Sequence, residues 1–200
     1  MSLKASTGPG TLTLSHPNTY TGGTTIKKGA LVVKNTTGSA TGPGAVQVKF
    51  GTPEGVGKIS GAVTVGTGTS SGAILLAGNS VTSPGTLTIN SALTFESMST
   101  YKCLLKRSTS STGQVTAVAG KVSALGVIIN SGVPFTFIDT GTGILPIGMV
   151  FTVINNTSAS PIAGRFSNLA NGLIFTSNGN NFKVNYTGGT GNDLTLKVVP

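Results

Sequence analysis

Apolar and polar residues alternate along most of the chain, in short runs that break at Gly, Pro or Asn. A two-residue period places successive side chains on opposite faces of a strand, so each run predicts a short β-strand. In the first half the expected strands span 11–14, 24–26, 30–33, 45–50, 62–65, 73–76, 86–89 and 92–95. In the second half they span 101–105, 115–120, 121–129, 133–138, 149–154, 172–176, 181–186 and 193–199.

The alternation also predicts which side chains of the first half face the interior. One apolar set recurs at every second position, and the register of a strand decides whether that set is buried. We expect the following to point inward: Leu12, Leu14, Ile26, Leu31, Val33, Val46, Val48, Ile74, Leu76, Leu87 and Ile89. No long window combines helical spacing with a capping residue, so almost no helix is expected.

Two short sequence repeats distinguish between the architectures that such strands permit. Regular short strands form either a β-sandwich or a β-solenoid. The hexapeptide PGTLTL at 9–14 returns as PGTLTI at 84–89, and YTGGT at 20–24 returns at 186–190. Stacked rungs produce repeats of this kind, so the prediction is a β-solenoid, with a β-sandwich as the alternative. We interpret each YTGGT as a rung corner that requires at least one glycine at positive φ.

The composition indicates one rigid domain over residues 1–200. Hydrophobic residues make up 38% of the chain and charged residues only 8%, and there are 30 glycines. A chain this apolar can bury a core, unlike a disordered one. The single cysteine, Cys103, forms no internal disulfide and is expected to be a buried small side chain. No apolar run is long enough for a membrane-spanning helix, and the start lacks a signal peptide, so no membrane insertion is expected.

The net charge of +9 excludes few partners by itself, but its distribution argues against nucleic acid. The lysines are spread along the chain, arginine occurs only at 107 and 165, and tryptophan is absent. Nucleic-acid readers usually cluster arginines among aromatic residues. Lys27 and Lys28, like the group Lys102, Lys106 and Arg107, are interpreted as solvated strand faces. Attraction to anionic surfaces such as extracellular polysaccharide is the partner that this charge favours.

Three stretches resemble a known family. GTLTLSHPNTYTGGTTIKKGALVV at 10–33 closely resembles the autotransporter-associated β-strand repeat, except that His16 and Pro17 replace a glycine and its neighbour. SPGTLTINSALTFESMSTYKCLL at 83–105 and the tail at 160–199 look like strands of the same large bacterial surface proteins. The resemblance implies a right-handed parallel β-helix, with repeat-bearing rungs at 1–112 and closing rungs at 113–200. It also implies a secreted or cell-surface location and contact with neighbouring rungs of the parent chain.

Residues that could carry chemistry are sparse. GGTGND at 188–193 resembles calcium-binding repeats, but one copy supplies one carboxylate, whereas Ca²⁺ takes six to eight oxygens. We therefore interpret it as a turn. The lone histidine, His16, has no evident partner for a triad or a metal and is expected to be an exposed turn residue.

Glycoside hydrolysis needs two paired carboxylates. The acids are only Glu54, Glu96, Asp139 and Asp193, each in a separate expected rung or turn. The sequence thus predicts no catalytic, cofactor or metal site and no enzyme, but a structural or adhesive segment of an exported surface protein. The alternative is a polysaccharide-active or polysaccharide-binding β-helix, although the aromatic platform typical of carbohydrate-binding modules is poorly represented.

Overall fold

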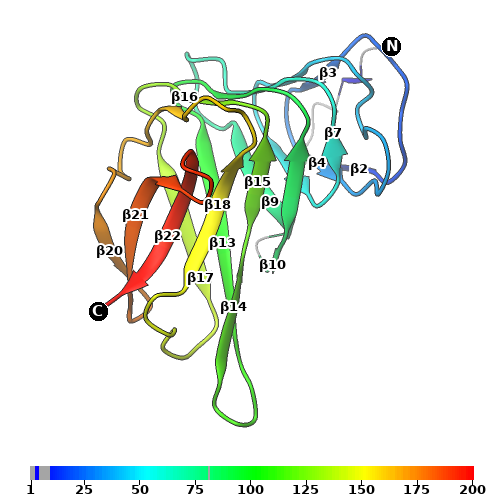
Figure 1. The fold of residues 1–200 in the computed structure, drawn as a ribbon. Helices are drawn as coiled ribbons and strands as arrows, with labels where there is room; N and C mark the ends of the chain where they lie inside the picture. The colour runs from blue at the N-terminus through cyan, green and yellow to red at the C-terminus, as the bar shows by residue number, and fades with distance from the viewer. Residues whose placement is uncertain (1–2, 5–9, 81) are drawn as a thin grey trace.

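The fold is a parallel β-solenoid, seen in a computed structural model that describes residues 3–4, 10–80 and 82–200 (Figure 1). The regular structure of these residues consists of strands and turns. They contain no helix, and therefore none that could span a membrane. The chain visits three sheets in turn and stacks each new strand on the strand of the previous turn. The predicted solenoid is confirmed, and the β-sandwich alternative is wrong.

The first sheet is parallel throughout. Its strands, in spatial order, are β1 (Leu3–Lys4), β3 (Thr24–Ile26), β5 (Val46–Val48), β8 (Val63–Val65), β12 (Leu93–Phe95), β16 (Val127–Ile129) and β19 (Ala163–Gly164). Thr24 pairs with Val46 near one end of this sheet, and Leu93 pairs with Val127 near the other. The second pair is further apart in sequence, so the later turns of the coil are longer than the early ones.

The second sheet is parallel along its main path. Its strands are β2 (Thr11–Leu14), β4 (Ala30–Val33), β6 (Thr52–Gly55), β9 (Ile74–Ser80), β13 (Thr100–Thr109) and β17 (Phe135–Thr140). Two antiparallel additions depart from this path: β10 (Ser83–Pro84) on β9, and β14 (Val115–Ala119) on β13. The β13–β14 hairpin projects from the body of the coil (Figure 1).

The third sheet changes from parallel to antiparallel along its length. It begins with β7 (Lys58–Ile59), β11 (Thr86–Ile89), β15 (Lys121–Ala124) and β18 (Val150–Asn156), all parallel. It continues with β22 (Asp193–Val199), β21 (Asn180–Gly188) and β20 (Ile174–Ser177), all antiparallel to their neighbours. The coil therefore ends in an antiparallel meander.

The two YTGGT copies occupy different positions, which corrects the expectation that both are rung corners. The first copy precedes β3 in the parallel coil, whereas the second ends β21 and enters the turn to β22. Gly188 pairs directly with Asp193, and so short a connection joins antiparallel strands but cannot cross over to a parallel one. The expected glycine conformation is confirmed in both copies, with φ of +73° at Gly23 and +55° at Gly189.

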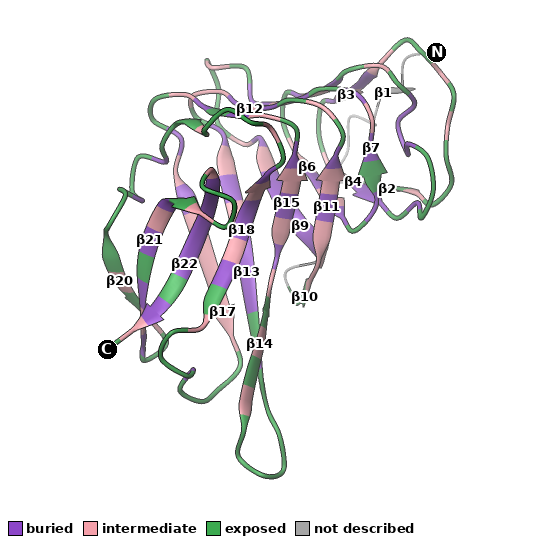
Figure 2. Ribbon diagram, viewed as in Figure 1, coloured by how far each residue is buried: buried purple, intermediate pink, exposed green. Residues whose placement is uncertain are grey.

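Buried residues occur on strands of all three sheets (Figure 2), and their side chains form one continuous core. The predicted inward positions are buried in most strands, namely Ile26, Leu31, Val33, Val46, Val48, Leu87 and Ile89, while Leu12 and Leu14 are partly buried against the core. The register is wrong in β9, where Leu75 faces the core instead of Ile74 and Leu76. Residues 73–77 are all apolar, so this stretch contains no alternation from which a register could be assigned.

Candidate functional site

Three of the four acidic side chains, Asp139, Glu96 and Asp193, accept hydrogen bonds from separate partners. Asp139 Oδ1 accepts a hydrogen bond from Arg107 Nε at 2.8 Å, and both side chains are 1% exposed. Arg107 also donates to the carbonyl oxygens of Gly141 and Gly143, so it fixes the loop that follows β17. The interpretation of Arg107 as part of a solvated face is therefore wrong, because a buried acid and two backbone carbonyls use its donors.

Two further acids also fix loops. Glu96 Oε2 accepts from the Nδ2 of Asn130 at 2.7 Å, and Asp193 Oδ1 accepts from the backbone N–H of Asn156 at 2.9 Å. Asp193 is 3% exposed in the turn that contains GGTGND. No group of three or more His, Cys, Asp or Glu residues suited to a metal occurs in the described part of the chain.

Glu54 lies on the outward face of β6, between two apolar residues. Its register partners are Val32 in β4 and Leu76 in β9, which are 5% and 3% exposed. Burial among these neighbours raises the pKa of the Glu54 carboxyl, and the nearby charge of Lys34 only partly opposes that rise.

This pKa shift predicts a pH dependence of stability. Because the folded pKa of Glu54 lies above its unfolded value, the folded state binds the proton more tightly, and acidification through this window stabilises the fold. On acidification from pH 7 to about pH 4.5, we expect the melting temperature of the parent to rise more, or fall less, than that of Glu54→Gln. Differential scanning calorimetry of both proteins at the two pH values measures this difference, and equal changes would contradict it.

Cys103 and His16 lie where the sequence predicts. Cys103 is fully buried, its Sγ lies 3.4 Å from the carbonyl oxygen of Gly120, and burial raises its pKa strongly. His16 is exposed at a bend, and its Nδ1 lies 3.2 Å from the hydroxyl of Ser15. No carboxylate is hydrogen-bonded to His16 within the described residues, so this contact lacks the third member of a catalytic triad.

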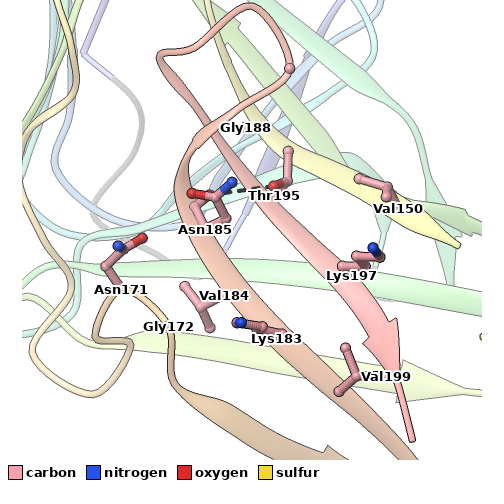
Figure 3. Close-up of a pocket in the computed structure, with 11 residues that line it drawn as sticks. Val150, Asn171, Gly172, Lys183, Val184, Asn185, Gly188, Thr195, Lys197 and Val199 are labelled. Atoms are coloured by element: carbon pink, nitrogen blue, oxygen red, sulfur yellow. Dashed lines mark hydrogen bonds between the residues drawn. The ribbon is translucent and has the colours of Figure 1, made fainter. Parts of the chain in front are cut away.

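A groove of about 680 Å³ crosses the outer face of the antiparallel meander (Figure 3). Its walls come mainly from β21 and β22, with Val150 from β18 and Asn171 and Gly172 from the loop before β20. One row of directly paired residues crosses four strands: Ile174, Lys183, Lys197 and Val150. The next row pairs Asn185 with Thr195, whose hydroxyl lies 3.4 Å from the backbone oxygen of Asn185.

The two lysines of the groove are direct cross-strand neighbours. Lys183 and Lys197 are both exposed, and opposite positions in an antiparallel pair place their Cβ atoms about 4.5–5.5 Å apart. Like charges in such a pair repel each other. The only ion pair among the described residues joins Arg107 and Asp139, so neither lysine is neutralised by a protein carboxylate there.

The groove was not predicted from the sequence, although a usable signal is present. NFKVNY and LTLKVV each place a lysine at a polar position of an alternating run, and a short turn joins the two runs. Interpreted as a hairpin, these runs bring Lys183 and Lys197 to the same face. Because 186–190 was interpreted as a rung corner, the two strands were not expected to pair, and Lys183 and Lys197 were not expected to be neighbours.

The first turn of the coil carries the match to a known family. Residues 7–33 match the passenger-associated-transport-repeat. This is an autotransporter passenger repeat, as the resemblance of 10–33 indicated. The match ends at Val33, which is also the last residue of β4, so the passenger repeat includes β2, β3 and β4. A comparison with curated protein sequences found no match.

Proposed function

We propose that this chain is a non-catalytic structural segment of an exported bacterial surface protein, in which it forms a rigid β-solenoid stalk. The observation that carries the proposal is the passenger repeat at 7–33, located in the first turn of a parallel coil. An autotransporter passenger is exported, so this repeat favours a secreted or cell-surface location.

The architecture supports a rigid stalk. Parallel stacking places a strand of each turn against strands of the turns before and after it, and the buried core continues through all the turns. In such a solenoid, stability comes mainly from interfaces between neighbouring turns. We propose that rungs at 1–112 extend the stalk and that residues 113–200 close it, with neighbouring rungs of the parent chain as the stacking partner.

The arrangement of the acids supports a non-catalytic role. Asp139, Asp193 and Glu96 each accept a hydrogen bond that fixes a loop, and Glu54 lies on a different face from Glu96. Asp139 and Glu54 share a sheet, but β9 and β13 separate their strands and Asp139 is offset along β17, which places their backbones more than about 14 Å apart at the usual strand spacing.

Surface labelling tests the proposal. An epitope inserted at the exposed turn of the β13–β14 hairpin, at residues 111–113, should be recognised by antibody on intact cells that express the parent protein, or in their medium. The same cells after permeabilisation provide the control for total protein. Detection only after permeabilisation would contradict the exported role.

A further inference from the structure

The cross-strand row, of which Lys183, Lys197 and Val150 line the groove and Ile174 lies beside it, combines positive charge with exposed apolar surface. Lys183 and Lys197 occupy its centre, and Ile174 and Val150 flank them at 53% and 54% exposure. Four adjacent strands carry this row, so it extends about 14 Å between the outer two strands. A ligand that lies along the row would contact two cations in the middle and an apolar side chain at each end.

Amide groups add hydrogen-bond donors beside the lysines. The Oδ1 of Asn171 accepts from the backbone N–H of Tyr186 at 2.9 Å, and the Oδ1 of Asn185 accepts from both the N–H and the hydroxyl of Thr187. Both oxygens are therefore used within the protein, and the two Nδ2 groups are available as donors at the groove (Figure 3).

The charge of this site is not balanced from within its own strands. The only acid on β20, β21 or β22 is Asp193. Asp193 is buried, accepts a hydrogen bond from the backbone N–H of Asn156, and lies at the opposite end of β22 from Lys197. An anionic group bound between Lys183 and Lys197 would remove the repulsion between these lysines, so the lysine pair favours an anion.

We propose that this groove binds an acidic polysaccharide, with uronic-acid carboxylates at Lys183 and Lys197. The amides of Asn171 and Asn185 would donate to sugar oxygens, and the apolar faces of the sugar rings would contact Val150 in the groove and Ile174 on the strand beside it. No arginine or aromatic residue lines the groove, so it lacks the stacking surface that single-stranded nucleic acid requires. This inference adds a ligand class to the proposed stalk and does not depend on its export.

Isothermal titration calorimetry of the whole chain with polygalacturonate tests the site. Replacing both lysines in Lys183→Gln/Lys197→Gln should weaken binding about tenfold or more, since each lysine near an anionic surface contributes a few-fold or more. Val150→Asp places an acid directly opposite Lys197 and should also weaken binding. Thermal melting of each variant separates loss of the site from unfolding. The midpoint of the double lysine variant should be no lower than that of the parent, because the two like charges repel each other in the parent.

A matched control distinguishes a site from general charge attraction. Lys27→Gln/Lys28→Gln removes the same number of charges from an exposed pair between β3 and β4, and should leave the affinity for polygalacturonate unchanged within about twofold. Equal weakening by both double variants would overturn the proposal. Tighter binding of a single-stranded oligonucleotide or of anionic phospholipid vesicles than of polygalacturonate would overturn it as well.

Discussion

Tyr101→Ala should lower the free energy of unfolding by about 3–5 kcal/mol, the range for removing a buried large aromatic side chain. Tyr101 is fully buried, and its ring centre lies 5.7 Å from that of Phe95, 5.7 Å from Phe135 and 5.9 Å from Phe166. Phe95 precedes Tyr101 in the same turn of the coil, whereas Phe135 and Phe166 follow in later parts of the chain, so the cavity would open between neighbouring turns. Denaturant unfolding followed by circular dichroism measures the change.

Tyr101→Phe separates the contribution of the ring to stability from that of the hydroxyl. The hydroxyl of Tyr101 donates to the carbonyl oxygen of Val153 at 2.7 Å, and its removal leaves that carbonyl without this donor. We expect a cost of about 1–2 kcal/mol, well below that of the alanine variant. If alanine and phenylalanine prove equally costly, packing among these rings is not what stabilises this part of the coil.

The local pattern predicted the strands of the coil because most of them alternate strictly. TLTL at 11–14 and TLTI at 86–89 became β2 and β11 with the expected bounds. TPEG at 52–55 was missed, since Pro, Glu and Gly are rare in strands and typical of turns. It is a strand because β4 and β9 on either side supply its hydrogen-bond partners. Stacking between turns thus determines its conformation against local propensity.

The candidate site was harder to predict because it depends on pairing between strands. Lys183 and Lys197 are each ordinary outward-facing residues of an alternating run, and only the antiparallel register makes them neighbours. The buried pair of Arg107 and Asp139 was missed for a related reason. A parallel pairing of β13 with β17 brings these two residues together across a long stretch of sequence. Periodicity within one strand contains no information about either contact.

Gly55→Ala should destabilise the protein by about 3 kcal/mol or more, although it adds only one carbon atom. Gly55 has a φ of +129° within β6, a conformation that residues with a Cβ rarely adopt. A Cβ at this position would lie 2.0 Å from the carbonyl oxygen of Val33, the residue that pairs with Gly55 in β4. The obstacle is backbone, so relief requires β4 and β6 to move apart.

Gly113→Ala provides the matched control for this prediction. Gly113 also has a positive φ, +81°, in the turn between β13 and β14, but a Cβ added there would have no atom within 4 Å beyond its chain neighbours. Alanine at this position introduces backbone strain without a clash, so we expect a cost of only about 1 kcal/mol. Urea unfolding of both variants compares the two costs directly. A similar cost for Gly55→Ala and Gly113→Ala would mean that neighbouring turns of the solenoid yield easily, and that close stacking of β4 on β6 contributes little to its stability.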